Sequence, residues 1–391
     1  MKCIRLAFAC LFIAIICSCN STEKKPDVSV VSVSDSAPAH YDVAVYYFPQ
    51  WHVDAKNVKK YGRDWTEWEV LQAAKPKFAG HIQPKVPLWG YEDEADPKVM
   101  SKKIDVAVAN GINVFLFDWY YNNDGQFLQR PLEEAFMKTN NNRMKFAIMW
   151  ANHQKIKPVI FDSVMDICIN KYFKDPSYWM IDGAPYFCLY QLYTFIESFG
   201  SVEKAKEALQ RFRAKTIAAG FKDLHFNAMQ WGLHMPDSMP AKDANELIDI
   251  FGVNSVDTYV WIHHTDPAFP TDTYDNLMDK AFRYWDSAYT GFKVPYHPNV
   301  TMGWDPTPRC DQNKPWKKGE YPYTGVLVGN TPEKFKVSLQ RAKDFLDKKN
   351  PKHKIVTINS WNEWTEGSYL EPDTLNKMQY LEAIKDVFGM K

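Results

Sequence analysis

The chain has 391 residues, of which 46% are hydrophobic and 24% are charged. This length and composition exclude a disordered chain and a small disulfide-stapled domain, because they allow a large buried core. Lys and Arg total 47 and so do Asp and Glu, which argues against nucleic acid as a partner, since phosphate binding needs a basic excess. The chain contains 14 Trp and 21 Tyr, whose flat amphipathic rings can pack in a core or stack on sugars.

Residues 1–19 have the pattern of a bacterial lipoprotein signal. Lys2 and Arg5 precede an apolar run, and this run is short for a membrane-spanning helix but typical of a signal peptide. The run ends in the letters ICSC, which resemble a lipobox, so we expect lipidation at Cys19. The alternative interpretation of the run is an ordinary buried helix.

The segment over 20–39 is polar and rich in Ser and Pro, which is typical of a flexible tether. We therefore expect a catalytic domain over 40–391 that meets a membrane only through the lipid on Cys19. Asn20 directly follows that cysteine and is compatible with an outer-membrane destination in the cell envelope. The pattern leaves open whether the domain faces the periplasm or the outside.

Cofactor and metal motifs are missing from the sequence. The cysteines beyond the leader are Cys168, Cys188 and Cys310, and no CxxC pair occurs, so we expect buried thiols rather than a zinc or redox site. No Gly-x-Gly pair and no phosphate-binding GxxxxGK[ST] loop exists. His263 and His264 lack the spacing of metal ligands. We therefore expect no cofactor and no metal.

Apolar runs of strand length recur from residue 43 onward and alternate with helix-like segments. In chain order the runs are VAVYYFPQ from Val43, NVFLFDWYY from Asn113, KFAIMWAN from Lys145, APYFCLYQ from Ala184, LHFNAMQW from Leu224, IFGVNSVDTYVW from Ile250, NVTMGW from Asn299 and KIVTINSWNEW from Lys354. The helix boundaries between them are Asp96-Pro97 to Gly111, Ser201 to Gly220, and a start at Thr331-Pro332-Glu333.

Eight strands alternating with helices predict the α/β class and a (β/α)8 barrel with long loops. The rival is a doubly wound open sheet, which the missing Gly-x-Gly fingerprint disfavours. Long insertions over 53–97 and 305–330 follow the first and seventh strands. Active sites of barrels are built from such loops at the carboxyl ends of the strands.

Aromatic residues stand beside carboxylates and amides at nearly every predicted strand end. Any single Trp can be a packing residue, but the repeated mixture favours a glycan cleft, because rings stack on sugars while carboxylates and amides bind hydroxyls. The residues that we expect to bind substrate are Tyr47, His52, Asp118, Tyr120, Trp150, Asn152, Gln230, Asp257, Trp304, Asp305, Arg309, Trp361 and Asn362. Tyr190, Gln191, Trp231 and Tyr259 also stand at strand ends.

Glu363 and Glu366 lie three residues apart just beyond the last strand, in the motif WNEWTEGSYLEPD. Glycosidic cleavage usually takes two carboxyl groups, one of which protonates the leaving oxygen. The flanking Trp residues and Asn362 could hold and partly desolvate the two groups. We therefore expect Glu363 and Glu366 to be catalytic; the alternative is a solvated charge pair.

Several motifs together resemble the WbsX family. These are YYFPQWH (46–52), DWTEW (64–68), KPKFAGHIQPKVPLWGY (75–91), FDWYY (117–121), MGWDPTPR (302–309) and WNEWTEGSYLEPD (361–373). That family is labelled a glycosyltransferase family, and it is similar in fold and terminal motif to glycoside hydrolase family 99, the endo-α-mannosidases and endo-α-mannanases. The resemblance covers about 40–390.

The resemblance implies a barrel that cleaves α-linked glycans with retention and without metal. It implies that Glu363 deprotonates the sugar 2-hydroxyl, which attacks the anomeric carbon and gives a 1,2-anhydro sugar. Glu366 would act as general acid and then as general base. Two positions depart from the related motifs: His153 stands where WbsX-like chains usually carry Glu, and Thr365 where family 99 carries His.

Three functions remain as alternatives. The first is an envelope-anchored retaining glycoside hydrolase that acts on a polysaccharide or oligosaccharide. The second is a glycosyltransferase for polysaccharide biosynthesis, against which the lipoprotein leader counts because sugar nucleotides are absent beyond the inner membrane. The third is a sugar-binding lipoprotein without catalysis.

Overall fold

The computed structural model describes residues 40–233 and 243–389 of the chain. The predicted signal over 1–19 with its Cys19, and the tether over 20–39, lie outside the described residues, so these expectations stay predictions. The account below concerns the unit from His40 to Lys391.

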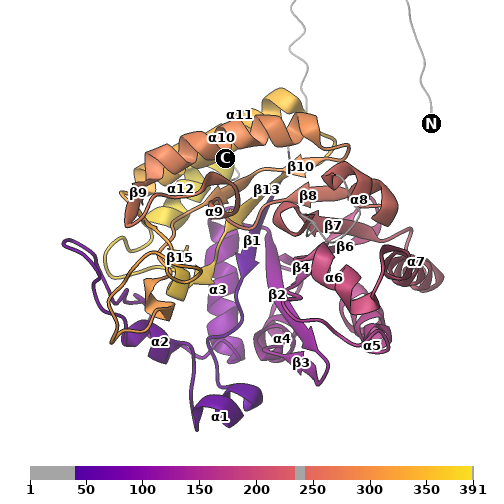
Figure 1. The fold of residues 1–391 in the computed structure, drawn as a ribbon, viewed down its shortest axis with the longest axis horizontal. Coiled ribbons are helices and arrows are strands. Elements are labelled where there is room, and N and C mark those ends of the chain that lie inside the picture. Colours follow the sequence, from indigo (N-terminus) through magenta and orange to yellow (C-terminus); the bar gives the residue numbers. More distant parts are fainter. Residues whose placement is uncertain (1–39, 234–242, 390–391) are drawn as a thin grey trace, which may run out of the picture. The chain divides into compact units, whose positions relative to one another are not determined.

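Parallel strands run through the middle of this unit and helices lie around them (Figure 1). Within the described residues, the strands in sheet order are β10 (Tyr296–His297), β8 (Ser255–Asp257), β7 (His225–Met229), β6 (Ala184–Leu189), β4 (Lys145–Trp150), β2 (Val114–Asn122), β1 (Tyr41–Tyr47), β13 (Lys354–Asn359) and β11 (Asn299–Thr301). Short additional strands are β3 (Gly125–Phe127), β5 (Met180–Ile181), β9 (Thr271–Thr273), β12 (Val326–Val328), β14 (Asn362–Glu363) and β15 (Ser368–Tyr369).

Pro298 separates β10 from β11, and these two pieces join the ends of the sheet. Tyr296 of β10 lies opposite Val256 of β8. Directly after the proline, Asn299 of β11 lies opposite Thr357 of β13. One short stretch of chain therefore bonds to both ends of the sheet, which makes it the seventh strand of a ring. The predicted (β/α)8 barrel is confirmed.

Helices connect successive strands. Those described are α1 (Ala55–Tyr61), α2 (Trp68–Gln72), α3 (Pro97–Ala109), α4 (Met137–Thr139), α5 (Ile160–Ile167), α6 (Leu192–Phe199), α7 (Val202–Ala218), α8 (Ala244–Phe251), α9 (Ile262–Thr265), α10 (Tyr274–Gly291), α11 (Pro332–Lys349) and α12 (Gln379–Phe388). Single-turn segments are η1 (Pro131–Phe136), η2 (Cys168–Phe173), η3 (Gln230–Leu233), η4 (Thr307–Arg309) and η5 (Trp364–Glu366). Over the described residues, no helix is both long and apolar enough to span a bilayer.

Capping residues explain why three helix starts were predictable. The side chains of Asp96, Ser201 and Thr331 accept hydrogen bonds from backbone N–H groups in the first turns of α3, α7 and α11. Such caps satisfy donors that a helix start leaves unpaired. The predicted starts of these three helices are confirmed.

The sixth predicted run begins too early. Ile250 and Phe251 end helix α8, and Gly252 follows in the left-handed conformation with a φ of 60°. Strand β8 begins only at Ser255. A buried helix end and a buried strand are both apolar, so the run of letters alone does not separate them.

The three cysteines of this unit, Cys168, Cys188 and Cys310, are buried and unbonded to one another, as predicted.

Two long insertions pack against each other beyond the barrel. The Nζ atom of Lys77 donates to Gln312 at 2.7 Å, which joins the insertion over 53–97 to the insertion over 305–330. This contact helps to fix the loop that carries Arg309.

Candidate active site

A pocket of about 650 Å³ lies at the carboxyl end of the barrel. All eight strands of the ring, or the loops directly after them, contribute to its wall. The lining residues are Phe48, Asp118, Tyr120, Met149, Ala151, His153, Tyr190, Gln191, Trp231, Tyr259, Val260, Ile262, His263, Trp304, Arg309, Tyr321, Glu363 and Glu366. This is the end at which (β/α)8 enzymes carry their active sites.

The wall includes part of the predicted set and leaves part of it outside. Six of the predicted residues line the pocket, namely Asp118, Tyr120, Trp304, Arg309, Glu363 and Glu366. Nine lie outside its lining, namely Tyr47, His52, Trp150, Asn152, Gln230, Asp257, Asp305, Trp361 and Asn362. The structure thus brings both glutamates together with four expected binders.

Three of the nine outlying residues are aromatic side chains of the core. Tyr47 packs on Phe117 with ring centroids 4.6 Å apart. The rings of Trp150 and Trp361 are likewise buried and contact other aromatic rings. These three rings therefore pack in the core, because a ring without exposed surface has no face on which a sugar could stack.

His52 and Asp257 are also enclosed by protein. His52 has no exposed surface, and burial lowers its pKa to about 4, which keeps the imidazole neutral. Asp257 lies inside the barrel, where the hydroxyl of Tyr46 donates to its Oδ2 at 2.9 Å. Burial raises the pKa of Asp257 to about 7. Neither side chain belongs to the wall of the pocket.

The other four outlying residues are direct chain neighbours of lining residues. Asn152 precedes His153, Gln230 precedes Trp231, Asp305 follows Trp304, and Asn362 precedes Glu363. Of these pairs, Asn362 and Glu363 lie in strand β14, where successive side chains point to opposite sides. A strand-end motif therefore brings its members to one place but sends only some of them into the pocket.

Two of these neighbours bind the backbone or side chains of adjoining loops. Asn152 donates to the backbone oxygen of Gln191 at 2.7 Å and accepts from its N–H at 2.8 Å. Asp305 contacts the Nε2 atom of His81 at 2.7 Å and accepts from Gln83 at 2.6 Å. These contacts position the walls rather than the substrate.

Several lining residues were missing from the predicted binding set. Tyr190, Gln191, Trp231 and Tyr259 stood at predicted strand ends, so a signal for them existed. His153 was noted only as a departure from related motifs. Phe48, His263 and Tyr321 carried no signal of their own, and Tyr321 reaches the pocket from the middle of the insertion over 305–330.

Glu363 and Glu366 lie on a short hairpin, which we call the terminal hairpin. Its strands β14 and β15 pair antiparallel, with Glu363 opposite Ser368, and η5 forms the turn between them. Ser360 fixes the hairpin: its Oγ accepts the N–H of Glu363 at 3.0 Å and donates to the backbone oxygen of Ser368 at 2.7 Å. The turn places both carboxyl groups on the pocket wall.

Gly367 is the residue that allows this turn. Its φ is 64°, and a Cβ atom at this position would lie 2.6 Å from the Cβ of Asp305. The N–H of Asp305 donates to the backbone oxygen of Glu366. Only glycine combines this backbone conformation with such a close approach of the next loop.

Arg309 links the carboxyl groups of the pocket. Its Nη2 lies 3.1 Å from Oε2 of Glu363, and its Nη1 donates to Oε1 of Glu366. Its Nε lies 3.3 Å from Glu67, a residue behind the wall. The hydroxyl of Tyr321 donates to the same Oε1 of Glu366 at 2.7 Å. Arg309 is therefore already paired with three carboxylates.

Several buried acids lie close together in the pocket, and this shifts their pKa values. Burial raises the pKa of Glu363 well above its usual range, the nearby charge of Glu366 adds to this rise, and Arg309 opposes it. Burial also raises the pKa of Asp118. Burial and Arg309 lower the pKa of His153, which favours its neutral form. Acids whose pKa values are raised in this way are suited to moving protons near neutral pH.

Aromatic rings form another part of the wall. The Trp231 side chain is 37% exposed and stacks on His263 with centroids 4.9 Å apart. Burial lowers the pKa of His263 to about 4, so its ring is neutral. The ring of Tyr190 packs near the rings of both Trp231 and His263. A partly exposed Trp supported from behind is suited to stacking on a sugar face.

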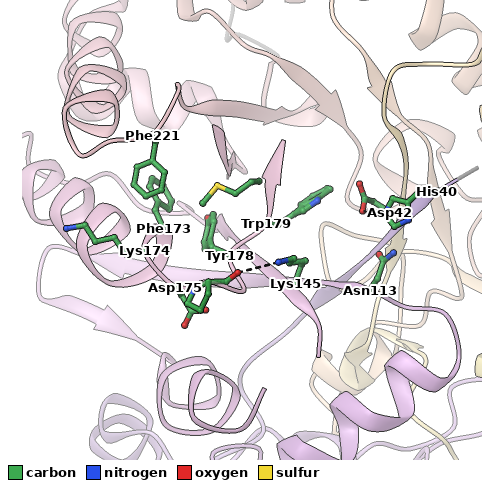
Figure 2. A pocket seen from close by; sticks show the side chains of 12 residues that line it. His40, Asp42, Asn113, Lys145, Phe173, Lys174, Asp175, Tyr178, Trp179 and Phe221 are labelled. Atoms are coloured by element: carbon green, nitrogen blue, oxygen red, sulfur yellow. Dashed lines mark hydrogen bonds and ion pairs between the residues drawn. The ribbon is translucent and has the colours of Figure 1, made fainter. Parts of the chain in front are cut away.

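A second cavity of about 750 Å³ lies at the amino ends of β1, β2 and β4 (Figure 2). Its Trp179 is only 3% exposed, and the Nζ of Lys145 donates to the backbone oxygen of Pro176 at 3.3 Å. Its polar groups thus bind the chain itself, and active sites of barrels lie at the opposite end.

Among the described residues, no group of three or more His, Cys, Asp and Glu is arranged to hold a metal ion.

The sequence matches a known family and two curated relatives. The model of the family described as "Glycosyltransferase WbsX" matches residues 43–158 and 162–384. The "Uncharacterized protein WxcX" of Xanthomonas campestris pv. campestris strain B100 is 24% identical over 369 residues, which is 88% of this chain and 49% of the relative. A WxcX protein from a second strain is also 24% identical and matches over 50% of its length. The chain spans about half the length of these relatives.

Similar solved structures are barrels of glycoside hydrolases. The GH99 endo-alpha-mannosidase of Bacteroides thetaiotaomicron is 17% identical with a TM-score of 0.53, over 88% of this chain and 95% of that chain. A "Glycoside hydrolase-like protein" is 16% identical with a TM-score of 0.58, over 90% of this chain and 94% of that one. At such low identity the likeness shows a shared fold.

Proposed function

The chain belongs to the WbsX family, described as a glycosyltransferase family, and on that premise we propose that it is a retaining glycoside hydrolase that cleaves α-linked glycosidic bonds. The observation that carries this proposal is the terminal hairpin, which places Glu363 and Glu366 in one pocket and joins both to Arg309. Two carboxyl groups in one pocket are what glycosidic cleavage usually takes, and the partly exposed Trp231 of the same pocket offers a ring for a sugar to stack on.

In the proposed reaction, Glu363 removes the proton of the sugar 2-hydroxyl. The resulting oxygen attacks the anomeric carbon while Glu366 gives its proton to the leaving glycosidic oxygen, and a 1,2-anhydro sugar forms. Glu366 then takes a proton from water, which opens the three-membered ring at the anomeric carbon, and Glu363 returns its proton to O2. The configuration is retained because the anomeric carbon is inverted twice.

The surroundings of both groups support these roles. Burial raises the pKa of Glu363 above its usual range, and a carboxylate with a raised pKa is a stronger base than an ordinary one. Arg309 and Tyr321 both donate to Oε1 of Glu366, so in the proposed reaction Glu366 takes up and delivers its proton on Oε2. The two carboxyl groups thereby differ in environment, as an acid and a base must.

The charge of the wall favours hydrolysis over glycosyl transfer from a sugar nucleotide. Among the described lining residues, Arg309 is the cation, and it is paired with carboxylates, while Asp118, Glu363 and Glu366 are acids. The diphosphate of a sugar nucleotide would meet these acids without a cation to bind it. The family description keeps transfer as the second candidate function.

A screen for released products tests the proposal. The leaderless protein, from about residue 21, is incubated with α-mannans and other bacterial and plant polysaccharides beside the Glu363→Gln, Glu366→Gln double variant. Oligosaccharide release by the wild type alone supports a hydrolase and identifies its substrate class. Binding by both proteins without release indicates a sugar-binding lipoprotein, and turnover only with a sugar nucleotide indicates a transferase.

We also propose that the enzyme is anchored to the bacterial cell envelope by a lipid on Cys19. The support is the charged, apolar and cysteine-ending pattern of residues 1–19. Expression of the full chain with a labelled fatty acid should give a labelled membrane-bound protein. The Cys19→Ser variant should carry no label; a label that persists in this variant would contradict the proposed anchor.

A further inference from the structure

Asp118 is a third acid in the pocket, and the proposed reaction does not use it. It lies in the middle of β2, is 3% exposed and lines the same pocket as the two glutamates. Its Oδ2 is 3.1 Å from the hydroxyl of Tyr259. That same hydroxyl is 3.1 Å from Oε1 of Glu363. Tyr259 therefore bridges Asp118 and Glu363.

The bridge requires one more proton than Tyr259 can supply. A phenol hydroxyl has a single proton and donates one hydrogen bond, while an ionised carboxylate can only accept. If both acids were ionised, one of the two oxygens would face a lone pair of the hydroxyl at hydrogen-bond distance. Both contacts are hydrogen bonds when one of the two carboxyl groups carries a proton and donates it to Tyr259.

The contacts of Arg309 decide which acid carries that proton. The guanidinium forms its ion pairs with Glu67, Glu363 and Glu366 and not with Asp118. A carboxylate is stabilised by a charged donor in contact with it. We infer that Asp118 is the protonated member of the pair: it donates to Tyr259, which in turn donates to ionised Glu363.

The groups around Asp118 agree with a neutral acid. Those that interact with it electrostatically are Tyr120 on its own strand, Cys188 in β6, Tyr190 after β6, Tyr259 after β8, Arg309 in η4, and Glu363 and Glu366 on the terminal hairpin. Burial has the largest effect and raises the pKa of Asp118; Glu366 raises it further, while the hydrogen bond from Tyr259 and the charge of Arg309 lower it. Burial raises the pKa of Glu363 as well, so the direct contact of Arg309 with Glu363 is what distinguishes the two acids.

This proton gives Asp118 a role in the proposed reaction, and the inferred role depends on that reaction being correct. With Asp118 protonated, both Tyr259 and Arg309 donate to Glu363 and hold its carboxylate in one orientation as a base. If Asp118 ionises, it competes for the Tyr259 proton and the orientation is lost. Asp118 is thus a positioning residue that acts through Tyr259.

The variant Asp118→Asn distinguishes a role as a protonated hydrogen-bond donor from a role as an ionised carboxylate. The amide of Asn has nearly the same shape and donates a hydrogen bond as a protonated carboxyl does. We expect Asp118→Asn to keep kcat within about tenfold of wild type, and Asp118→Leu, which cannot donate, to lose about a hundredfold. The fall of kcat/KM at high pH should move to higher pH in Asp118→Asn. Equal losses in both variants would overturn the inference.

Infrared spectroscopy tests the proton itself and needs no substrate. At neutral pH, the protonated-carboxyl absorption of the full chain, to which the buried Glu94 and Asp257 also contribute, should lose one component in Asp118→Asn. The matched control is Asp124→Asn, because Asp124 lies just beyond β2 and is exposed, with its pKa lowered by the hydrogen bond from Lys56. An unchanged band in Asp118→Asn would overturn the inference. Because this measurement is independent of turnover, its outcome stays separate from that of the product screen.

Discussion

Two clusters of the barrel each place one buried or half-buried cation among glutamates, and they differ in their access to solvent. In the pocket, Arg309 lies between Glu363 and Glu366. Behind it, Lys103 of α3 lies between Glu94 at 2.6 Å and Glu371 at 2.5 Å. We call the first the pocket cluster and the second the sealed cluster. Each places one cation between two acids, and Arg309 has Glu67 as a third partner. The main difference between the clusters lies in what surrounds them.

The sealed cluster satisfies its charges entirely within the protein. Lys103 is 1% exposed, and Trp364 donates to Glu371 at 2.7 Å. Asn362 donates to Glu94 and also binds both backbone polar groups of Phe48. By contrast, the Arg309 side chain is 20% exposed and its acids face the pocket.

The two clusters meet at one peptide unit of β14. The side chain of Asn362 points to the sealed cluster, while that of the next residue, Glu363, points to the pocket. Because successive side chains of a strand point to opposite sides, the buried Asn362 anchors the strand whose next residue, Glu363, points into the pocket. The comparison teaches that similar charges stabilise structure where water is excluded, and that they are available to a ligand, as the proposed reaction requires, where they border a pocket.

Removing the acids of the pocket cluster should have the largest effect. Glu366→Gln should lower kcat/KM by roughly 10²–10⁴-fold on substrates with poor leaving groups, because these need a proton. The loss should be much smaller with an activated leaving group. Glu363→Gln should be poor on both, since the attack on the anomeric carbon fails in either case.

The measurement compares a natural glycan with an activated aryl glycoside of the same sugar. Glu382→Gln is a suitable control, because Glu382 is exposed on α12 and lies outside the pocket. Mild and equal effects of the Glu363 and Glu366 substitutions on both substrates would remove these two residues from catalysis.

Removing the cation of the sealed cluster should instead lower stability. Lys103→Met leaves two acids buried without their partner, which typically costs about 3–5 kcal/mol in the free energy of unfolding. The adjacent Lys102 of α3 offers a matched control, since its side chain is 37% exposed and pairs with Glu92 at the surface. Lys102→Met should cost at most about 1 kcal/mol. Urea unfolding measures both, and equal values would show that burial does not distinguish them.

The sequence predicted the barrel better than it predicted the pocket. Apolar runs report that a strand is buried, and caps such as Ser201 report where a helix begins, because both are local properties. Which neighbour at a strand end faces the pocket depends on register: Trp304 lines it while Asp305 binds His81 behind it. Tyr321 was beyond prediction because an insertion folds back to bring it there.

The sealed cluster also predicts a dependence of stability on pH. Burial raises the pKa of Glu94 to about 8, so this acid keeps its proton in the folded protein at pH values where it would lose it when unfolded. Its contribution is full below an unfolded value of about 4.3 and is lost as the pH rises toward about 8. We expect the stability of the wild type to fall over this range by at most about 1.4 kcal/mol per pH unit from this group.

Glu94→Gln should flatten that fall without abolishing it. Asp257, whose pKa burial raises to about 7, adds a slope of the same sign. Asp182 and Asp347 have pKa values lowered to about 2 and so change charge below this range. Unfolding by urea at several pH values gives the slope. A slope identical to that of the wild type would show that Glu94 is ionised throughout.

The smallest effect concerns the hydroxyl of Tyr321, which donates to Glu366 at 2.7 Å although the residue as a whole is 48% exposed. Tyr321→Phe removes one hydrogen bond to an acid and little packing, so kcat should fall by about tenfold on poor leaving groups while stability is unchanged. Tyr323→Phe is the control, because the Tyr323 hydroxyl accepts from the backbone of Asp311 in the same insertion. If both variants behaved alike, Tyr321 would merely order the loop. If only Tyr321→Phe loses activity, the hydroxyl acts on Glu366, and the pocket cluster extends into an insertion that the barrel itself does not determine.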